Sequence, residues 1–64
     1  MKTFEVIEKD GSSSKVEAEM FKLRSEKLAF FVNNTSVYQY DKNTVGKVIE
    51  EVPTGETPII TRIS

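Results

Sequence analysis

The densest run of apolar side chains lies in the middle of the chain, where residues 28–32 read Leu-Ala-Phe-Phe-Val. A second alternating stretch, residues 36–40, follows the polar segment Asn33-Asn34-Thr35. Phe, Val and Tyr suit a pleated, half-buried surface, and Asn tolerates the positive φ that tight turns require. The pattern therefore predicts a β-hairpin at the centre of a small sheet. Strand alternation assigns its first strand two faces: Leu28, Phe30 and Val32 on one, Ala29 and Phe31 on the other.

Alternation of apolar and polar residues also occurs before and after this hairpin in the sequence. Residues 2–9 predict a first strand with Phe4 and Val6 pointing inward, and Asp10-Gly11 followed by three serines predicts a turn longer than two residues. Residues 44–52 predict a later strand, in which Gly46 marks a β-bulge or a close backbone approach.

Residues 15–24 allow two interpretations. As a strand they change phase, which predicts a β-bulge near Met20-Phe21. As a helix, residues 14–17 match a capping box, and the helix would cover residues 15–27. We prefer the strand, because the helix would run into the Phe-rich strand without a Gly, Asn or Pro to end it. The strand requires only a short turn at residues 25–27.

The C-terminal segment, residues 57–64, is rich in Ile and Thr and has strong β character. Pro58 confines it to a sheet edge or to the start of a strand. Either it closes the sheet within the chain, beside the first strand, or it pairs with another chain as an added strand. We favour closure within the chain.

Strands at about ten-residue spacing predict a single all-β domain over residues 1–64. We expect an antiparallel meander of about five to six strands that curls into a barrel-like sheet. The layout resembles an SH3-like or other small barrel, a likeness of architecture that carries no activity with it. The alternative is an α+β fold with a helix at about residues 15–27 packed on a sheet.

Composition bounds the remaining possibilities. A chain of 64 residues buries only about 60% of its unfolded surface, and it has no Cys to form a disulfide. A homodimer would bury more surface. The net charge of −1, with both signs interspersed, disfavours a partner recognised through phosphate neutralisation. The longest apolar run is too short to span a bilayer, so we expect a cytoplasmic protein with no membrane partner.

The residue types present argue against catalysis. The chain has no His, Cys or Trp, which excludes imidazole acid–base chemistry, Cys-His nucleophiles and ordinary zinc sites. Its glycines form no phosphate-binding loop, and its glutamates mostly alternate with apolar residues, as on a solvated sheet face. We therefore predict no enzyme activity, no catalytic or metal site and no cofactor.

Two surfaces remain as candidates for binding. The leading hypothesis is a non-catalytic protein-interaction domain that associates with a protein partner, or with itself, through the C-terminal edge residues Ile59, Ile60 and Ile63. The alternative is a weak single-stranded nucleic-acid-binding module with stacking aromatics and backbone-contacting cations. Its residues would be Tyr38, Tyr40, Lys22, Arg24 and Lys27.

Overall fold

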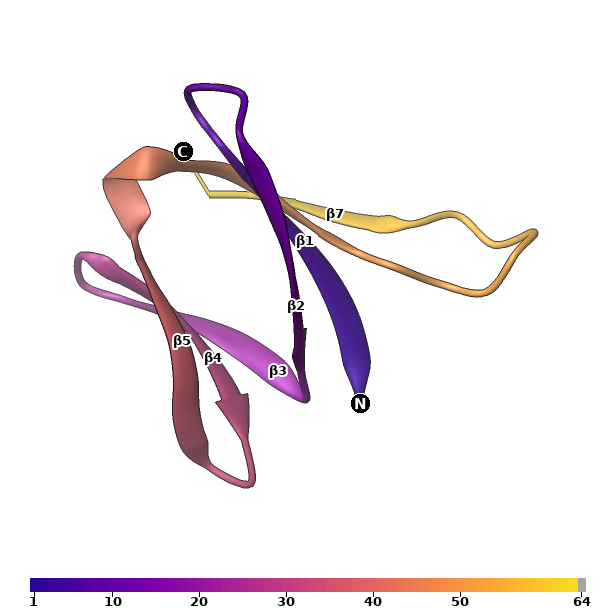
Figure 1. Cartoon of the computed structure of the whole chain (residues 1–64), viewed down its shortest axis with the longest axis horizontal. Helices are drawn as coiled ribbons and strands as arrows, with labels where there is room; N and C mark the ends of the chain where they lie inside the picture. The colour runs from indigo at the N-terminus through magenta and orange to yellow at the C-terminus, as the bar shows by residue number, and fades with distance from the viewer. Residues whose placement is uncertain (64) are drawn as a thin grey trace.

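The computed structural model describes residues 1–63, so Ser64 of the predicted C-terminal segment lies outside the described residues. Over this range the chain is all-β, with strands in two antiparallel sheets and one short 3-10 turn, η1 (Figure 1). The elements in chain order are β1 (Lys2–Glu8), β2 (Ser13–Ala18), β3 (Met20–Arg24), β4 (Lys27–Val32), β5 (Thr35–Asp41), η1 (Lys42–Thr44), β6 (Val45–Glu50) and β7 (Ile59–Arg62).

The first sheet has four strands in the order β2-β1-β6-β7, and the second has three in the order β3-β4-β5. The predicted all-β class is confirmed. Residues 1–63 form seven strands rather than five to six, and within this range no ladder closes the two sheets into one continuous barrel.

The helix considered for residues 15–27 is wrong. This segment forms the end of β2, all of β3 and the first residue of β4. Val16 and Ala18 are buried in the core, and β2 pairs with β1 while β3 pairs with β4. Good helix formers such as Glu, Ala and Lys adopt the strand conformation here, because pairing with neighbouring strands outweighs the weak preference of intrinsic helix propensity.

The predicted β-bulge near Met20-Phe21 is wrong, because β3 pairs with β4 in continuous register through both residues. The change of phase lies instead at Glu19, between β2 and β3, where the chain passes from one sheet to the other. The Glu19 amide donates to the Phe31 carbonyl oxygen at 2.9 Å. Its carboxylate Oε1 accepts a hydrogen bond from the Asn33 amide at 2.9 Å. These bonds hold the bend against the β4–β5 hairpin. Ala18 before the bend is buried, whereas Met20 after it is exposed.

The central hairpin is confirmed as β4 and β5. Asn33 and Asn34 have φ values of 52° and 62°, the positive values that a two-residue turn of this hand requires. A register shift between Phe30 and Phe31 sets Tyr38 opposite Phe30. Leu28 and Phe30 face the core, and Ala29 and Phe31 face the other side, as the alternation predicts.

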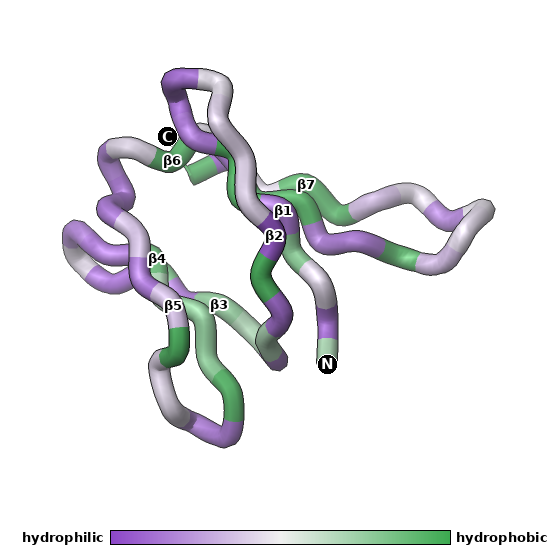
Figure 2. Tube along the Cα trace, viewed as in Figure 1, coloured by the Kyte–Doolittle hydropathy of each residue, from purple (hydrophilic) through white to green (hydrophobic). Residues whose placement is uncertain are grey.

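The core lies between the two sheets and centres on aromatic rings. The Phe4 ring centroid lies 5.4 Å from that of Phe30 and 5.5 Å from that of Phe21. Each fully buried side chain of this size contributes about 1.5–3 kcal/mol. Figure 2 shows apolar segments in both sheets and mainly polar residues in the loop between β1 and β2. The buried residues of the cluster are Phe4, Val6, Val16, Ala18, Leu28, Phe30, Val45, Val48 and Ile63.

Gly46 lies at an irregularity in the β1–β6 ladder, where Ile7 pairs with Lys47 and Glu8 with Val45. A Cβ atom on Gly46 would lie 3.4 Å from the Ile7 carbonyl oxygen. Of the two predicted alternatives the bulge is confirmed, since a Cβ at this distance would be in ordinary van der Waals contact. The extra residue also explains why Val45 and Val48, three positions apart, are both buried.

The C-terminal strand closes the sheet within the chain, but beside β6 rather than beside β1. The predicted neighbour was wrong because β1 already has β2 on one side and β6 on the other, which leaves it no free edge. Pro58 immediately precedes β7, one of the positions where a missing N–H removes no ladder bond.

Candidate functional site

β7 forms one end of the four-stranded sheet, and among residues 1–63 no strand pairs with its outer edge. The loop after β6, residues 51–58, projects away from the body of the molecule and leads into this strand (Figure 1). An uncovered sheet edge presents backbone N–H and C=O groups that another strand can use.

The hydrogen-bond register shows which backbone groups are available. The Ile63 amide donates to the Gly46 carbonyl oxygen at 2.9 Å, and the ladder continues with Thr61 opposite Val48. Antiparallel ladders alternate between hydrogen-bonded and non-hydrogen-bonded pairs. The N–H and C=O groups of Ile60 and Arg62 therefore point away from β6, toward the free edge.

The three isoleucines predicted as an interaction surface do not share one environment. Ile59 and Ile60 are 54% and 57% exposed, whereas Ile63 is 7% exposed and belongs to the core. Ile60 lies opposite Ile49 of β6, so two aliphatic side chains adjoin on the outer face of the sheet. Ile59 and Ile60 thus remain as surface candidates, while Ile63 anchors the strand.

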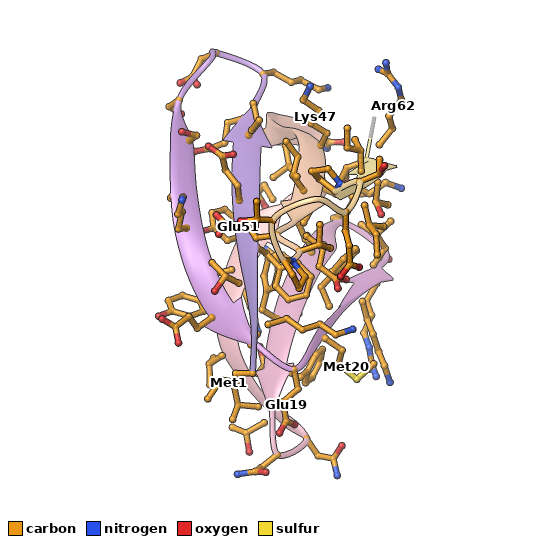
Figure 3. The ribbon with its side chains drawn as sticks, turned by 90° about the vertical axis from the view of Figure 1, so that its right-hand side faces the viewer. Met1, Glu19, Met20, Lys47, Glu51 and Arg62 are labelled. Carbon is orange, nitrogen blue, oxygen red and sulfur yellow. The ribbon has the colours of Figure 1, made fainter. Side chains whose placement is uncertain are left out.

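A pair of like charges lies next to this aliphatic pair. Lys47 of β6 is directly opposite Arg62 of β7, and Figure 3 shows both side chains projecting from the same end of the sheet. Neither makes an ion pair with a described residue, although Lys2 pairs with Glu50 at 3.7 Å on the same sheet. Like charges directly opposite on neighbouring strands are destabilising. In the part of the chain that the structure describes, neither cation of this edge therefore has an acidic side chain within ion-pair distance.

The predicted basic residues lie together on the outer face of the second sheet. Lys22 is opposite Ala29, and Arg24 is opposite Lys27. The Lys27 ammonium pairs with the Asp41 carboxylate at 2.8 Å, which leaves the other two cations without an ion pair among the described residues. Of the three basic residues, Arg24 and Lys27 line a shallow depression of about 490 Å³, together with Ala29, Phe31, Asn34, Ser36 and Gln39.

The two tyrosines lie on the opposite face of that sheet. Tyr38 is opposite Phe30 and Tyr40 is opposite Leu28, on the side that faces the core. The Tyr40 ring centroid is 6.0 Å from that of Phe30, and its hydroxyl shares a hydrogen bond of 3.0 Å with the Ser14 hydroxyl. The combined aromatic and basic surface required by the nucleic-acid hypothesis is therefore split between two faces.

Phe31 is the aromatic residue that does share a face with the basic side chains. The Lys22 ammonium lies 5.8 Å from its ring centroid, so a cation already covers part of the ring. Sequence reasoning missed this pairing, although the alternation had assigned Phe31 to the side away from Phe30. The register between β3 and β4 was the missing information.

A second depression, of about 320 Å³, lies near the β1–β2 loop and is lined by Glu8, Lys9, Asp10, Asn43 and Thr44. Its carboxylate at Asp10 already accepts hydrogen bonds from the Ser12 hydroxyl at 2.7 Å and the Ser12 amide at 2.8 Å. These bonds lower the pKa of Asp10, the hydroxyl bond most strongly. Both bonds end on Oδ1 and tie the carboxylate to its own loop.

Over residues 1–63, no three His, Cys, Asp or Glu side chains group closely enough to hold a metal ion. The described part of the chain also contains no helix with the length and apolarity needed to cross a membrane. Comparisons with protein-family models, curated proteins and solved structures find no match to this chain.

Proposed function

We propose that this protein is a non-catalytic interaction domain that binds an extended segment of a partner protein as an added strand along β7. The observation that carries the proposal is the free edge at Ile60 and Arg62, whose backbone groups point away from β6. The exposed side chain of Ile60 supplies apolar contact next to these groups. Edge-strand addition is a recurrent mode of peptide recognition in which main-chain bonds give affinity and side chains give specificity.

The expected affinity is modest. Ile60 and Arg62 each offer one N–H and one C=O, and each net hydrogen bond contributes about 0.5–1.5 kcal/mol. Association costs at least about 4 kcal/mol in lost translational and rotational freedom. The backbone bonds alone therefore give weak, reversible binding, and side-chain contacts decide which partner binds.

A second copy of the chain fits this edge less well than a different partner. Antiparallel pairing of two β7 strands around Thr61 would set Ile60 of one copy opposite Arg62 of the other. The two Arg62 side chains would then be diagonal neighbours, each beside its own Lys47. Four cations would gather with no acid among them, which opposes the pairing.

The experiment is a selection of linear peptides from a display library against the whole chain, followed by amide hydrogen exchange with the enriched peptides. We expect new protection at the Ile60 and Arg62 amides, and loss of binding in Ile60→Pro. This variant removes the outward N–H and the exposed side chain of Ile60 but no hydrogen bond to β6, so the sheet should stay folded. Enriched peptides that leave these amides unprotected would overturn the proposal.

Thr61→Pro serves as the contrasting variant. The backbone N–H of Thr61 points toward β6, so its removal should destabilise the sheet. Truncation after Val52 is a poor test, since it also removes the buried Ile63. Light scattering of the free protein measures self-association directly. The proposed location is the cytoplasm, which fractionation of expressing cells would check.

A further inference from the structure

We infer that the partner segment entering at β7 runs antiparallel and carries an acidic residue followed, two positions later, by an aliphatic residue. This inference rests on the proposed strand addition, and it specifies the chemistry of the segment. It comes from three features of the edge: its positive charge, the exposed aliphatic side chains on its outer face, and the direction of its free backbone N–H and C=O groups.

The acidic position follows from Arg62. Lys47 and Arg62 are directly opposite each other, and the ion pairs of the described residues leave both unmatched. A strand added outside β7 would place one of its residues directly opposite Arg62. An Asp or Glu at that position lies within cross-strand reach of the guanidinium and offsets part of the positive charge of the Lys47–Arg62 pair.

The aliphatic position follows from Ile60, which lies two residues before Arg62 and on the same face of the strand. Ile60 is more than half exposed and lies beside Ile49 of β6. An aliphatic side chain opposite Ile60 would extend this pair to a row of three across the sheet. Opposite residues have Cβ atoms about 4.5–5.5 Å apart, which is packing distance for Val, Ile or Leu.

The backbone determines which residues of β7 can bond to the partner and in which direction the partner strand runs. Every strand pair in both sheets is antiparallel, and in antiparallel pairs residues lie directly opposite one another. The series of residues whose backbone groups point away from β6 ends at Pro58, which has no N–H to donate. Among the described residues, the backbone groups available to a partner are thus those of Ile60 and Arg62, and the partner residue opposite Arg62 comes first in the partner's sequence. The residue between the two specified positions is unrestricted.

The test uses two blocked peptides, acetyl-Thr-Glu-Thr-Val-Thr-amide and its Glu-to-Lys counterpart, titrated into the whole chain at low salt. Amide shifts and hydrogen exchange are followed at Ile60 and Arg62. We expect the Glu peptide to bind at least about threefold more tightly than the Lys peptide. Arg62→Glu should reverse this preference. Lys22→Glu, on the other sheet, changes net charge equally and should leave the preference intact.

The outcomes separate the inference from the function on which it rests. If both peptides protect the Ile60 and Arg62 amides equally, strand addition stands and the acidic preference is wrong. A preference lost equally in Lys22→Glu reflects net charge and also overturns the inference. If neither peptide, nor any library peptide, protects these amides, strand addition itself fails and the inference fails with it.

Discussion

Replacing Ile63 by alanine tests whether the residue that follows β7 fastens this strand to the core. Ile60→Ala is the matched control, because the same side chain is shortened three positions earlier. Ile63 is 7% exposed and packs in the core cluster, whereas Ile60 is 57% exposed. The two variants therefore differ in burial and little else.

The magnitudes follow from that difference. Shortening a buried Ile to Ala costs about 2–5 kcal/mol, which combines lost transfer energy with the cavity left behind. Shortening an exposed Ile on an edge strand costs less than about 1 kcal/mol, mainly through strand propensity. A domain of this length has a free energy of unfolding of about 3–10 kcal/mol. Ile63→Ala therefore removes a large part of the total, and Ile60→Ala does not.

Urea unfolding followed by far-ultraviolet circular dichroism measures both variants. With a slope of about 1 kcal/mol per molar urea, the midpoint should fall by about 2 M or more in Ile63→Ala and by less than about 1 M in Ile60→Ala. If Ile63→Ala is unfolded without urea, Ile63→Val, which costs about 0.5–1.5 kcal/mol, takes its place. Equal shifts at positions 60 and 63 would refute the assigned packing of β7.

Three further predictions concern local interactions. Asn34→Val should cost about 1–2 kcal/mol in thermal melts, because a branched residue opposes the positive φ of this turn position, while Asn34→Gly should not destabilise. The pKa of Asp10 lies below its ordinary value because of its bonds to Ser12. These bonds therefore stabilise the folded chain fully when the pH is above the ordinary pKa of Asp, and this stabilisation is lost as the pH falls through the lowered pKa. Ser12→Ala should raise that pKa in an NMR titration, and an unchanged value would contradict the role of the hydroxyl. The hydrogen bond and charge of Glu51 raise the pKa of Lys15. The stabilisation from this pair is therefore fully present below the ordinary pKa of Lys and is lost as the pH rises through the raised pKa. Glu51→Gln should lower the pKa of Lys15, measured through its side-chain NMR signals.

Local pattern was sufficient to predict most of the strands. The inward faces of Phe4 and Phe30 follow from period-two alternation, and the turn at Asn33-Asn34 follows from residues that accept positive φ. The bulge at Gly46 was also visible, since a glycine within a strand has few other uses. Each of these features depends on neighbours within a few residues.

Features that depend on pairing between distant segments were not predictable. The position of β7 beside β6 requires knowing that β1 has both edges occupied. The separation of Tyr38 from Lys22 requires the registers of β3 and β5 against β4. Ile63 resembles Ile60 in the sequence, and only the Gly46 bond and the core contact distinguish them.

The pairing of β1 with β6 has a consequence for how the chain folds during synthesis. The whole of the second sheet lies between these two strands in the sequence. Ribosomes add about 5–20 residues per second, so the edge of β1 that pairs with β6 stays without its partner for seconds while β4 and β5 emerge and pair. During that interval the nascent chain presents unpaired backbone groups of β1, and this is the period in which a chaperone would have most to protect.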